Sequence, residues 1–463
     1  MKKKRNKVPD GKDQSPLQQL KGLLKGRIIG PEDLEYHSAR EVFYRWIDRR
    51  PAAIVRVADS SDIARVVSYA RDHGLRLAVR SGGHSVAGHS MLDAGIVIDL
   101  TEMRGIEIDA SKRTAWAETG LTAGQYTVAT GAHGLATGFG DSGTVGIGGL
   151  TLGGGVGFLV RKHGMTIDDL LAADVITADG SVLRVDADSH PDLFWALRGG
   201  GGNFGVAARF KFRLHPVDQV VGGVLMLPAT AEIIRRFIQE AEAAPEELSV
   251  IANVMRAPPM PMIPQEYHGK LMIMAMMVYA GDIEAGQRVV APFKGLVQPV
   301  ADMVKPMMYP EIYAMEGPHP AAVAARSMFI DKVDTEISES IIHHIGISKA
   351  SMAVTQLRVL GGAMARVPED ATAFAHRNRR IMVNVAALYE NRSETDEHEA
   401  WASRITDALR RDPSVYVNFL GDEGEARVRD AYPPKTWNRL AKIKAQYDPG
   451  NFFRSNQNIP PAR

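Results

Sequence analysis

A histidine that follows two glycines is the first arrangement in this sequence that could carry out chemistry. In "RSGGHSVAGHS" (Arg80–Ser90), Gly82 and Gly83 precede His84, and "LRLAV" (Leu75–Val79) before them is typical of a buried strand. A turn with an incidental histidine is one interpretation. The other is a glycine loop that turns backbone N–H groups toward an anion, with His84 beside the ligand's reactive end.

Further glycine-rich segments favour the second interpretation. The segment "GFGDSGTVGIGGLTLGGGVG" (Gly138–Gly157) keeps apolar residues between its glycines, and four more glycines stand at 199–202. Alternating apolar residues predict a packed loop system and not a flexible linker. Several separated glycine nests beside a histidine indicate a large phosphate-bearing cofactor that lies extended between loops. The apolar residues are Val145, Ile147, Leu150, Leu152 and Val156.

The usual nucleotide and metal motifs do not explain these segments. G-x-G-x-x-G occurs at Gly138–Gly143 and Gly200–Gly205, but this motif works where a strand leads into a helix. The first match leads into more glycine, and the second follows an expected helix and leads into a strand. No GxxxxGK[ST] string occurs. His84 and His89 lack acidic companions, so we expect no metal site.

Composition excludes several classes of function. Lys and Arg number 55 against 54 Asp and Glu, which argues against nucleic acid or an anionic membrane as the main partner. With no cysteine, the chain has no disulfide, thiolate metal ligand or cysteine nucleophile. The basic start "MKKKRNKVPDGKDQSPLQQL" lacks the apolar stretch of a secretory signal. No window approaches the roughly 20 apolar residues of a membrane span. We expect a soluble cytoplasmic protein.

The elements that would position His84 can be read from apolar periodicity. Ala52–Gly83 predicts a strand to Val57, a helix capped by one of the residues 59–61, a helix end at Gly74 and a second strand. Short strands should continue from Gly95 to about Gly205, with a hairpin over 172–185 that turns at "ADG". A helix then precedes the four glycines, and a strand follows them. The predicted helix buries Ile63, Val66, Val67 and Ala70, and the last strand buries Val206, Ala208, Phe210, Phe212 and Leu214.

Length and composition predict two domains or one large mixed one. After Pro216 glycine falls and methionine rises, and the last segment regains turn residues. We expect a lead with a first helix over 1–45, a first domain over 46–217, a second over 218–412, and a return to the first over 413–463. "KLMIMAMMVYA" (Lys270–Ala280) predicts a core strand. Core filling is the favoured role of the methionines here and in "NVMRAPPMPMIP", and an adaptable apolar wall is the alternative.

Five ordered motifs carry a resemblance to a known family. They are "RSGGHSVAG", "GDSGTVGIGGLTLGGGVGFLVRKHGMTIDDLLAADVITADG", "LFWALRGGGGNFGV", "YVNFLGDEG" and "YDPGNFFRSNQNIPP". From Arg80 to Pro460 the chain resembles the berberine-bridge-enzyme-like FAD-linked oxidases of the vanillyl-alcohol-oxidase superfamily. The resemblance implies an α+β fold: a PCMH-type FAD-binding domain (46–217) with a second α+β substrate domain (218–412), an antiparallel sheet flanked by helices.

The resemblance also implies FAD bonded covalently to His84 through its 8α-methyl group. Such a bond prevents dissociation and raises the flavin's potential, which favours hydride abstraction from reluctant donors. Relatives with two covalent bonds add a cysteine in a C-P-T-V-G string. This chain has Ser142-Gly-Thr-Val-Gly146 there, so no second bond can form. We therefore expect a less open active site and a lower potential than in those relatives.

By the same resemblance, the Arg80–Ser85 amides hold the diphosphate, and 144–157 wraps the pyrophosphate and one ring face. Val175 meets the adenine end. Asn456 and Asn458 contact the cofactor or, alternatively, cap helices or turns. The full expected cofactor-binding set is Arg80, Ser81, Gly82, Gly83, His84, Ser85, Gly88, Gly140, Asp141, Ser142, Thr144, Val145, Gly148, Gly149, Thr151, Gly155, Gly157, Val175, Asn203, Gly205, Val206, Asn418, Asn456 and Asn458.

Oxidation of a C–OH or C–NH group by hydride loss also needs a base. Family members often use the first tyrosine of Y-x-N-Y, and here the string is Tyr416-Val-Asn418-Phe419. A tyrosine with a pKa of about 10 needs a cationic neighbour or the field of the flavin itself to act as a base. Arg358 is the candidate neighbour, and a surface ion pair is its alternative role. Tyr309 either lines the pocket or packs in the core.

A cation at Arg358 would repel an ammonium substrate and suit a neutral or acidic one. We therefore expect oxidation of an alcohol, a sugar or a secondary metabolite. In the family, a small residue at the position of Val145 leaves room for oxygen, which favours an oxidase that releases hydrogen peroxide over a dehydrogenase. Amine oxidation, oxidative cyclisation, and flavin binding with little turnover (Phe419 departs from the family string) are the alternatives. We expect a monomer or a homodimer.

Overall fold

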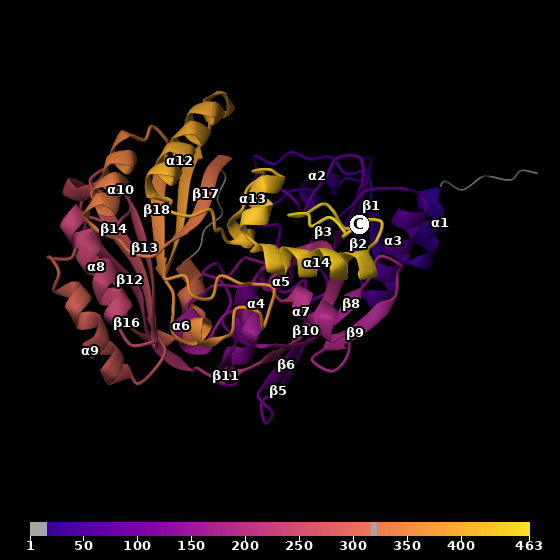
Figure 1. The fold of residues 1–463 in the computed structure, drawn as a ribbon, viewed down its shortest axis with the longest axis horizontal. Coiled ribbons are helices and arrows are strands. Elements are labelled where there is room, and N and C mark those ends of the chain that lie inside the picture. The colour runs from indigo at the N-terminus through magenta and orange to yellow at the C-terminus, as the bar shows by residue number, and fades with distance from the viewer. Residues whose placement is uncertain (1–15, 316–321) are drawn as a thin grey trace, which may run out of the picture.

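The computed structural model describes residues 16–315 and 322–463, and the strands of these residues form four sheets (Figure 1). Two of the sheets and the glycine-rich segments lie on the right in Figure 1, and an eight-stranded sheet with its helices lies on the left. The yellow C-terminal segment, with helices α13 (Glu425–Asp430) and α14 (Pro434–Tyr447), lies beside the indigo and magenta elements. Residues 1–15 of the expected lead lie outside the described residues.

The first sheet contains the predicted strand–helix–strand unit. Its order is β1-β2-β4-β3, with β2 and β3 parallel to β4. Helix α3 (Ser60–Asp72) begins where the Asp59 side chain accepts the Asp62 N–H, its apolar face is buried, and Gly74 follows its end at φ +63°. The prediction is confirmed. The four strands are β1 (Arg27–Ile29), β2 (Ala53–Arg56), β3 (Leu77–Arg80) and β4 (Ile96–Asp99).

Short elements precede this unit. The expected first helix is α1 (Pro16–Leu23), and a second short helix, α2 (Tyr36–Ala39), follows. Strand β1 was not predicted from the sequence, because three residues are too few to show a period. It pairs antiparallel with β2.

The second sheet is antiparallel, in the order β5-β6-β10-β8-β9. The predicted hairpin is present as β8 and β9, with Gly180 of its turn at φ +87°. Helices α4 (Ala123–Gly131) and α7 (Pro191–Leu197) pack beside this sheet and share its buried cluster. The strands are β5 (Ile106–Asp109), β6 (Thr114–Glu118), β8 (Leu170–Ile176), β9 (Val182–Asp186) and β10 (Val206–Arg213), and a two-stranded sheet of β7 (Leu135–Ala136) and β11 (His215–Pro216) lies nearby.

The glycine-rich segment 138–157 is not only a loop system, so that prediction was wrong in part. It contains helix α5 (Ile147–Gly153), and α6 (Val160–His163) follows it. Glycine disfavours helix intrinsically, but Ile147 and Leu152 are buried in the same cluster as α7. Burial of these side chains by tertiary packing offsets the weak propensity.

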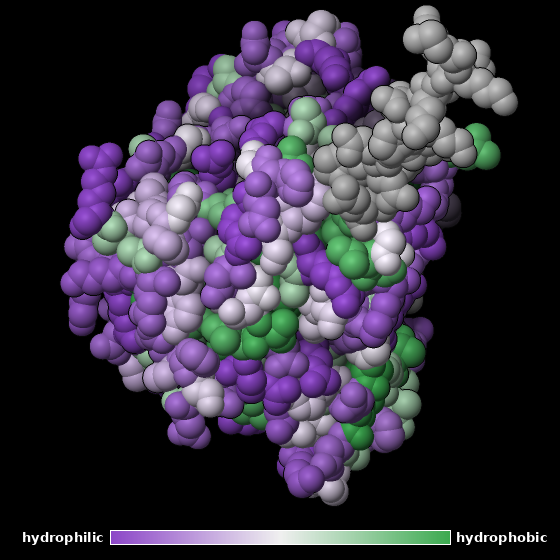
Figure 2. All heavy atoms as spheres, turned by 90° about the vertical axis from the view of Figure 1, so that its right-hand side faces the viewer, coloured by the Kyte–Doolittle hydropathy of each residue, from purple (hydrophilic) through white to green (hydrophobic). Residues whose placement is uncertain are grey.

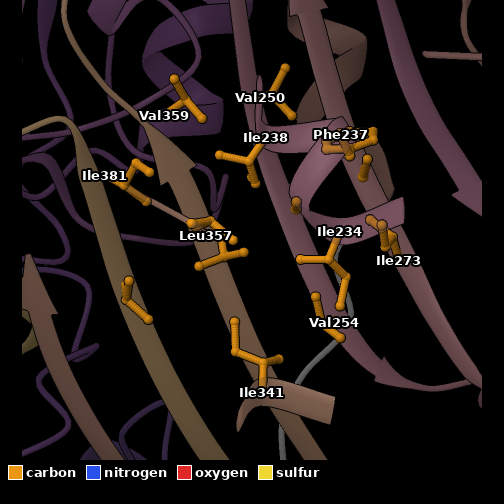
Figure 3. Close-up of a cluster of buried hydrophobic side chains, with 14 of the residues drawn as sticks. Ile234, Phe237, Ile238, Val250, Val254, Ile273, Ile341, Leu357, Val359 and Ile381 are labelled. Atoms are coloured by element: carbon orange, nitrogen blue, oxygen red, sulfur yellow. The ribbon is translucent and has the colours of Figure 1, made fainter. Parts of the chain in front are cut away.

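The eight-stranded sheet is antiparallel, and helices cover one of its faces. Residues that alternate along its strands bury their side chains against α8 (Ala231–Ala243), α9 (Ile283–Lys294), α10 (Thr335–Ile347) and α12 (Thr395–Leu409). Figure 3 shows this core, with Ile234, Phe237 and Ile238 of α8 beside Leu357 and Val250. The strand order is β15-β12-β14-β13-β18-β19-β17, with β16 beside β12. The strands are β12 (Gln219–Pro228), β13 (Leu248–Arg256), β14 (Leu271–Tyr279), β15 (Ala301–Asp302), β16 (Lys305–Met308), β17 (Ala322–Ile330), β18 (Met352–Val359) and β19 (Ile381–Tyr389).

The C-terminal segment packs against the second sheet and the glycine loops. Leu440 of α14 shares a buried cluster with Ala196 and Phe204, and the buried Lys444 ammonium donates to the Asn203 carbonyl at 2.6 Å. The predicted domain boundaries near residues 45, 217 and 412 stay predictions.

The described residues present no large apolar face in the direction of α1. Figure 2 shows this side as mostly hydrophilic, with small separate hydrophobic patches, which is ordinary for a protein surface. Among the helices of the described residues, none has the length and apolarity needed to cross a membrane.

Candidate active site

A cavity of about 870 Å³ separates the glycine loops from the face of the eight-stranded sheet opposite to α8, α9, α10 and α12. Its lining comes from segments that are far apart in the sequence: the loop around His84, the 140–156 segment, the 201–207 loop, strands of the large sheet, and the two C-terminal stretches 416–420 and 453–457. Such a large concave site, built where two layers meet, is the usual location of a cofactor together with its substrate.

Close backbone contact brings the first two glycine loops together. A Cβ on Gly82 would overlap the backbone nitrogen of Gly146, and a Cβ on Gly146 would overlap that of Gly82. Only glycine permits this approach. The contact fixes the loop of His84 against the loop of Val145, and both residues line the cavity.

His84 lies against an aromatic ring that sequence reasoning missed. Its imidazole stacks on Phe43, with 3.8 Å between ring centroids and 22° between planes, and the Phe43 N–H donates to the Gly83 carbonyl at 3.1 Å. Tyr44 lines the same wall, and burial, assisted by Asp141, raises the pKa of its phenol to about 12. The string "EVFYRW" that contains both rings has no spacing that points to a site.

The Tyr416 hydroxyl is held by two donors at the cavity wall. It accepts the Gly155 N–H at 2.7 Å and the Asn418 side-chain N–H at 2.9 Å. Glycines at the end of α5 make room for both side chains, since a Cβ on Gly153 would overlap the Asn418 amide. Burial raises the pKa of Tyr416 to about 12, while the two donated hydrogen bonds act to lower it.

Arg358 is buried, so its alternative role as a surface ion-pair partner is wrong. Its guanidinium forms an ion pair with Asp141 at 2.6 Å and donates to Gln356 Oε1 at 2.7 Å. It also lies 4.9 Å from the centre of the Phe419 ring, a cation–π contact at the position where the family tyrosine is lost.

Two expectations about Arg358 need correction. Its charge lowers the pKa of Tyr416 less than the hydrogen bonds from Gly155 and Asn418 do, and Asp141 opposes it. The paired Asp141 also cancels the positive charge that was expected to repel an ammonium substrate.

The structure brings most of the predicted cofactor-binding residues to one cavity. This part of the lining is Ser81, Gly82, Gly83, His84, Ser85, Gly140, Asp141, Ser142, Val145, Gly148, Gly149, Asn203, Gly205, Val206, Asn418 and Asn456, together with the predicted catalytic Arg358 and Tyr416.

Other predicted residues do not line the cavity. Arg80 is buried in a salt bridge with Asp99, which fixes β3 to β4. Gly155 supports Tyr416 through its N–H. Tyr309 packs in the core with Phe158, so the geometry gives it no catalytic role. The remaining predicted residues outside the lining are Gly88, Thr144, Thr151, Gly157, Val175 and Asn458.

The cavity fits a large cofactor with polar edges. Asn456 donates to the carbonyls of Gly202 and Phe453, so it joins the C-terminal segment to a glycine loop and does not cap a helix. Its Oδ1 is buried at the cavity lining with no hydrogen-bond partner among the described residues, and the Oδ1 of Asn458, outside the lining, is buried without one as well. Unpaired buried acceptors of this kind are costly unless a ligand donates to them. No cluster of potential metal ligands occurs among the described residues.

Comparisons with known proteins agree with this geometry. Residues 51–186 match the model of the FAD binding domain, and residues 415–460 match the model "Berberine and berberine like". An uncharacterised FAD-linked oxidoreductase of Bacillus subtilis is 30% identical over 458 residues, 96% of this chain and 98% of the relative. The (R)-6-hydroxynicotine oxidase of Paenarthrobacter nicotinovorans is 29% identical, over 95% of this chain and 97% of that enzyme.

Solved structures give the same result. The crystal structure of 6-hydroxy-D-nicotine oxidase from Arthrobacter nicotinovorans superposes with a TM-score of 0.86 at 27% identity, covering 95% of this chain and 98% of that chain. Xylooligosaccharide oxidase from Myceliophthora thermophila shares the fold, with a TM-score of 0.84 at 23% identity over 97% of this chain and all of that one.

The fold and the cavity together define an FAD-linked oxidoreductase with a PCMH-type FAD-binding fold. More narrowly, the chain belongs to the berberine-bridge-enzyme-like family of these oxidoreductases. The predicted α+β fold class and the family resemblance are confirmed.

Proposed function

We propose that the protein oxidises a hydroxyl-bearing small molecule, such as an alcohol, a sugar or a secondary metabolite, with FAD attached through His84 and oxygen as the electron acceptor, giving hydrogen peroxide. The observation that carries the proposal is that His84 and the doubly hydrogen-bonded Tyr416 line one cavity. When bound, FAD supplies the hydride acceptor.

His84 supports the covalent attachment by its position. Its ring is ordered against Phe43 at the cavity wall, and the Gly82–Gly146 contact holds its loop. Ser142, which stands where bicovalent relatives have cysteine, also lines the cavity. A serine cannot form that second bond, so His84 is the single attachment.

The hydrogen bonds around the Tyr416 hydroxyl support its role as the base that removes the substrate's hydroxyl proton. Both hydrogen bonds to its oxygen are donated by fixed groups, the Gly155 backbone and the Asn418 amide. The two hydrogen bonds stabilise the phenolate against the opposing effect of burial, and they leave the hydroxyl proton for an acceptor in the cavity. A substrate hydroxyl there would be held by Tyr416 and would lose its proton to the phenolate. Val145 lies at the cavity wall, and the small size of its side chain supports access of oxygen.

A specific observation keeps amine oxidation as a second candidate. Asp141 neutralises Arg358, so the cavity does not repel a cation as the sequence predicted. A relative and a solved structure, both named as hydroxynicotine oxidases, match nearly the whole chain.

A screen of the purified, flavin-loaded protein tests the proposal. Alcohols, sugars and cyclic amines are incubated with it in air, and peroxide release is measured. The same compounds are added under nitrogen, where a substrate bleaches the yellow colour. Bleaching with peroxide release from hydroxyl compounds supports the proposal. Release from amines alone selects the second candidate. Bleaching by dithionite and by none of the compounds would contradict both and leave a flavin-binding protein with little turnover.

A further inference from the structure

A row of three carboxamide side chains crosses the cavity face of the eight-stranded sheet. Asn253 of β13 lies directly opposite Gln356 of β18, which lies directly opposite Asn384 of β19. All three line the cavity. Residues opposite each other on neighbouring antiparallel strands project from the same face, so the row presents its amides side by side.

The carboxamides of Asn253 and Gln356 have hydrogen-bond partners, and the carboxamide of Asn384 has none among the described residues. Gln356 Nε2 donates to Asn253 Oδ1 at 2.9 Å, and Asn253 Nδ2 donates to the Met274 carbonyl at 3.1 Å. Gln356 Oε1 accepts from Arg358. The half-buried Asn384 side chain has no hydrogen bond to any residue that the structure describes, and the buried Oγ of Ser327, opposite it on β17, has none either.

Methionines surround this row and make the rest of the substrate side apolar. The alternation along β14 and β13 that buries Ile273 and Val254 under helices turns Met274, Met276 and Met255 into the cavity. The preference for core filling holds for Met272 and Met277, which are buried in core clusters and do not line the cavity, whereas Met274 and Met276 form part of an apolar wall. Thioether side chains are flexible and polarisable, so they fit apolar and aromatic surfaces of different shapes. The cavity methionines include Met226, Met255, Met274, Met276, Met303 and Met352.

The carboxylate and the guanidinium of the described cavity lining balance each other's charge. Asp141 is its one carboxylate and Arg358 its one guanidinium, and they are paired. Burial lowers the pKa of His89 to about 4, so its imidazole is neutral near pH 7. A charged substrate would lose its hydration without gaining an opposite charge, and a sugar would bury hydroxyls that methionine cannot pair.

We propose that Asn384 determines specificity for a neutral, largely apolar substrate, whose polar group hydrogen-bonds the Asn384 carboxamide while its apolar body contacts the methionines. This inference rests on the proposed function, because it narrows the substrate class of the same cavity.

The test measures binding, and three of its four probes cannot react. Cumyl alcohol has no hydrogen on its carbinol carbon, so it can bind but cannot be oxidised. Cumylamine and α,α-dimethylphenylacetate are its cationic and anionic counterparts, and methyl glucoside is the sugar. Calorimetric titration of the flavin-loaded protein gives Kd for each. We expect cumyl alcohol to bind at least about ten-fold more tightly than the other three, the ratio for about 1.4 kcal/mol.

Variants connect this preference to Asn384. Asn384→Leu should weaken cumyl alcohol binding about ten-fold by removing one hydrogen bond. Asn384→Asp adds an unpaired carboxylate and should make cumylamine the preferred probe. Asn378→Leu, at an exposed position outside the lining, should change nothing. Melting temperature and flavin content show whether each variant is folded. The order of affinities measured on the wild-type protein decides the substrate class even if a variant does not fold.

Several results would overturn the inference: equal binding of the four probes, tighter binding of a charged probe or the sugar, no binding of cumyl alcohol up to its solubility, or unchanged affinity in Asn384→Leu. Because the titration measures binding and three of the four probes cannot be turned over, failure of the peroxide screen together with the expected order of affinities contradicts only the proposed function. A successful peroxide screen together with a different order of affinities contradicts only this inference.

Discussion

The Asp141 carboxylate and the Arg358 guanidinium form an ion pair of 2.6 Å that joins the glycine-rich segment to the middle of the eight-stranded sheet. The Arg358 side chain is 5% exposed and that of Asp141 25%. The pair therefore connects the two layers that enclose the cavity, and it also removes the net charge from the cavity wall.

Asp141→Asn should destabilise the protein, because it leaves the buried Arg358 without a counter-charge. We expect the free energy of unfolding to fall by about 2 kcal/mol, a typical loss for a hydrogen bond to a charged group. Urea denaturation of the flavin-free protein measures it. The double variant Asp141→Asn/Arg358→Gln should lose less than the sum of the single variants. Simple additivity would show that the pair contributes no coupling.

His84→Ala should abolish covalent flavin attachment. After acid precipitation, the wild-type pellet should stay yellow, whereas the colour of the variant should appear in the supernatant. His89→Ala is the matched control, since His89 lines the same cavity five residues further along and should keep its flavin bound. A colourless wild-type pellet would contradict the attachment.

Tyr416→Phe should slow substrate reduction of the flavin by a factor of about 100 or more, the usual effect of losing a general base. Stopped-flow absorbance under nitrogen measures this step without oxygen. Tyr309→Phe is the control: Tyr309 packs in the core outside the cavity lining, so its variant should react at the wild-type rate. Equal rates for wild type and Tyr416→Phe would remove Tyr416 from the base role.

The rate of this step should rise with pH. Burial raises the pKa of Tyr416 to about 12, so near neutral pH only a small fraction is phenolate. Below the pKa, this fraction increases ten-fold with each pH unit. We expect a logarithmic slope near +1 between about pH 7 and 10 without a plateau, and no such slope in Tyr416→Phe. A flat wild-type profile would show that the phenolate is not the base.

Val145→Leu should slow reoxidation by oxygen and leave substrate reduction of the flavin unchanged. Val145 lines the cavity, and a larger side chain there would fill the space that oxygen requires. Mixing reduced protein with aerated buffer gives the reoxidation rate. If wild type and variant reoxidise equally slowly, an acceptor other than oxygen becomes the better assignment.

Local patterns predicted much of the fold. Period-two alternation located β8, β9 and β10, and the cap at Asp59 and the end at Gly74 bounded α3. Short-range signals suffice there, because capping and side-chain alternation depend on neighbours in sequence. Helix α5 was not predicted, because its glycines disfavour a helix. The burial of Ile147 and Leu152 offsets this weak propensity, but burial depends on tertiary contacts that local sequence does not show.

The candidate site was only partly predictable. The motifs around His84 and Tyr416 indicated their segments, but the partner of Arg358 depends on a contact with Asp141, 217 residues away. The carboxamide row depends on register: Asn253 and Gln356 are 103 residues apart and meet only because β13 pairs with β18. Nothing in a single sequence specifies which of many possible registers two distant strands adopt.

The methionine-lined wall has a consequence for the lifetime of the enzyme. The chain has 20 methionines and no cysteine, so every sulfur it offers to an oxidant is a thioether. A peroxide formed in the cavity would meet several of them before it reached solvent, and each sulfoxide would turn an apolar contact into a polar one. Continued catalysis would thus gradually reduce the selectivity of the cavity for apolar substrates. Because methionine sulfoxide reductases reverse this oxidation, their activity would determine how many turnovers each molecule completes.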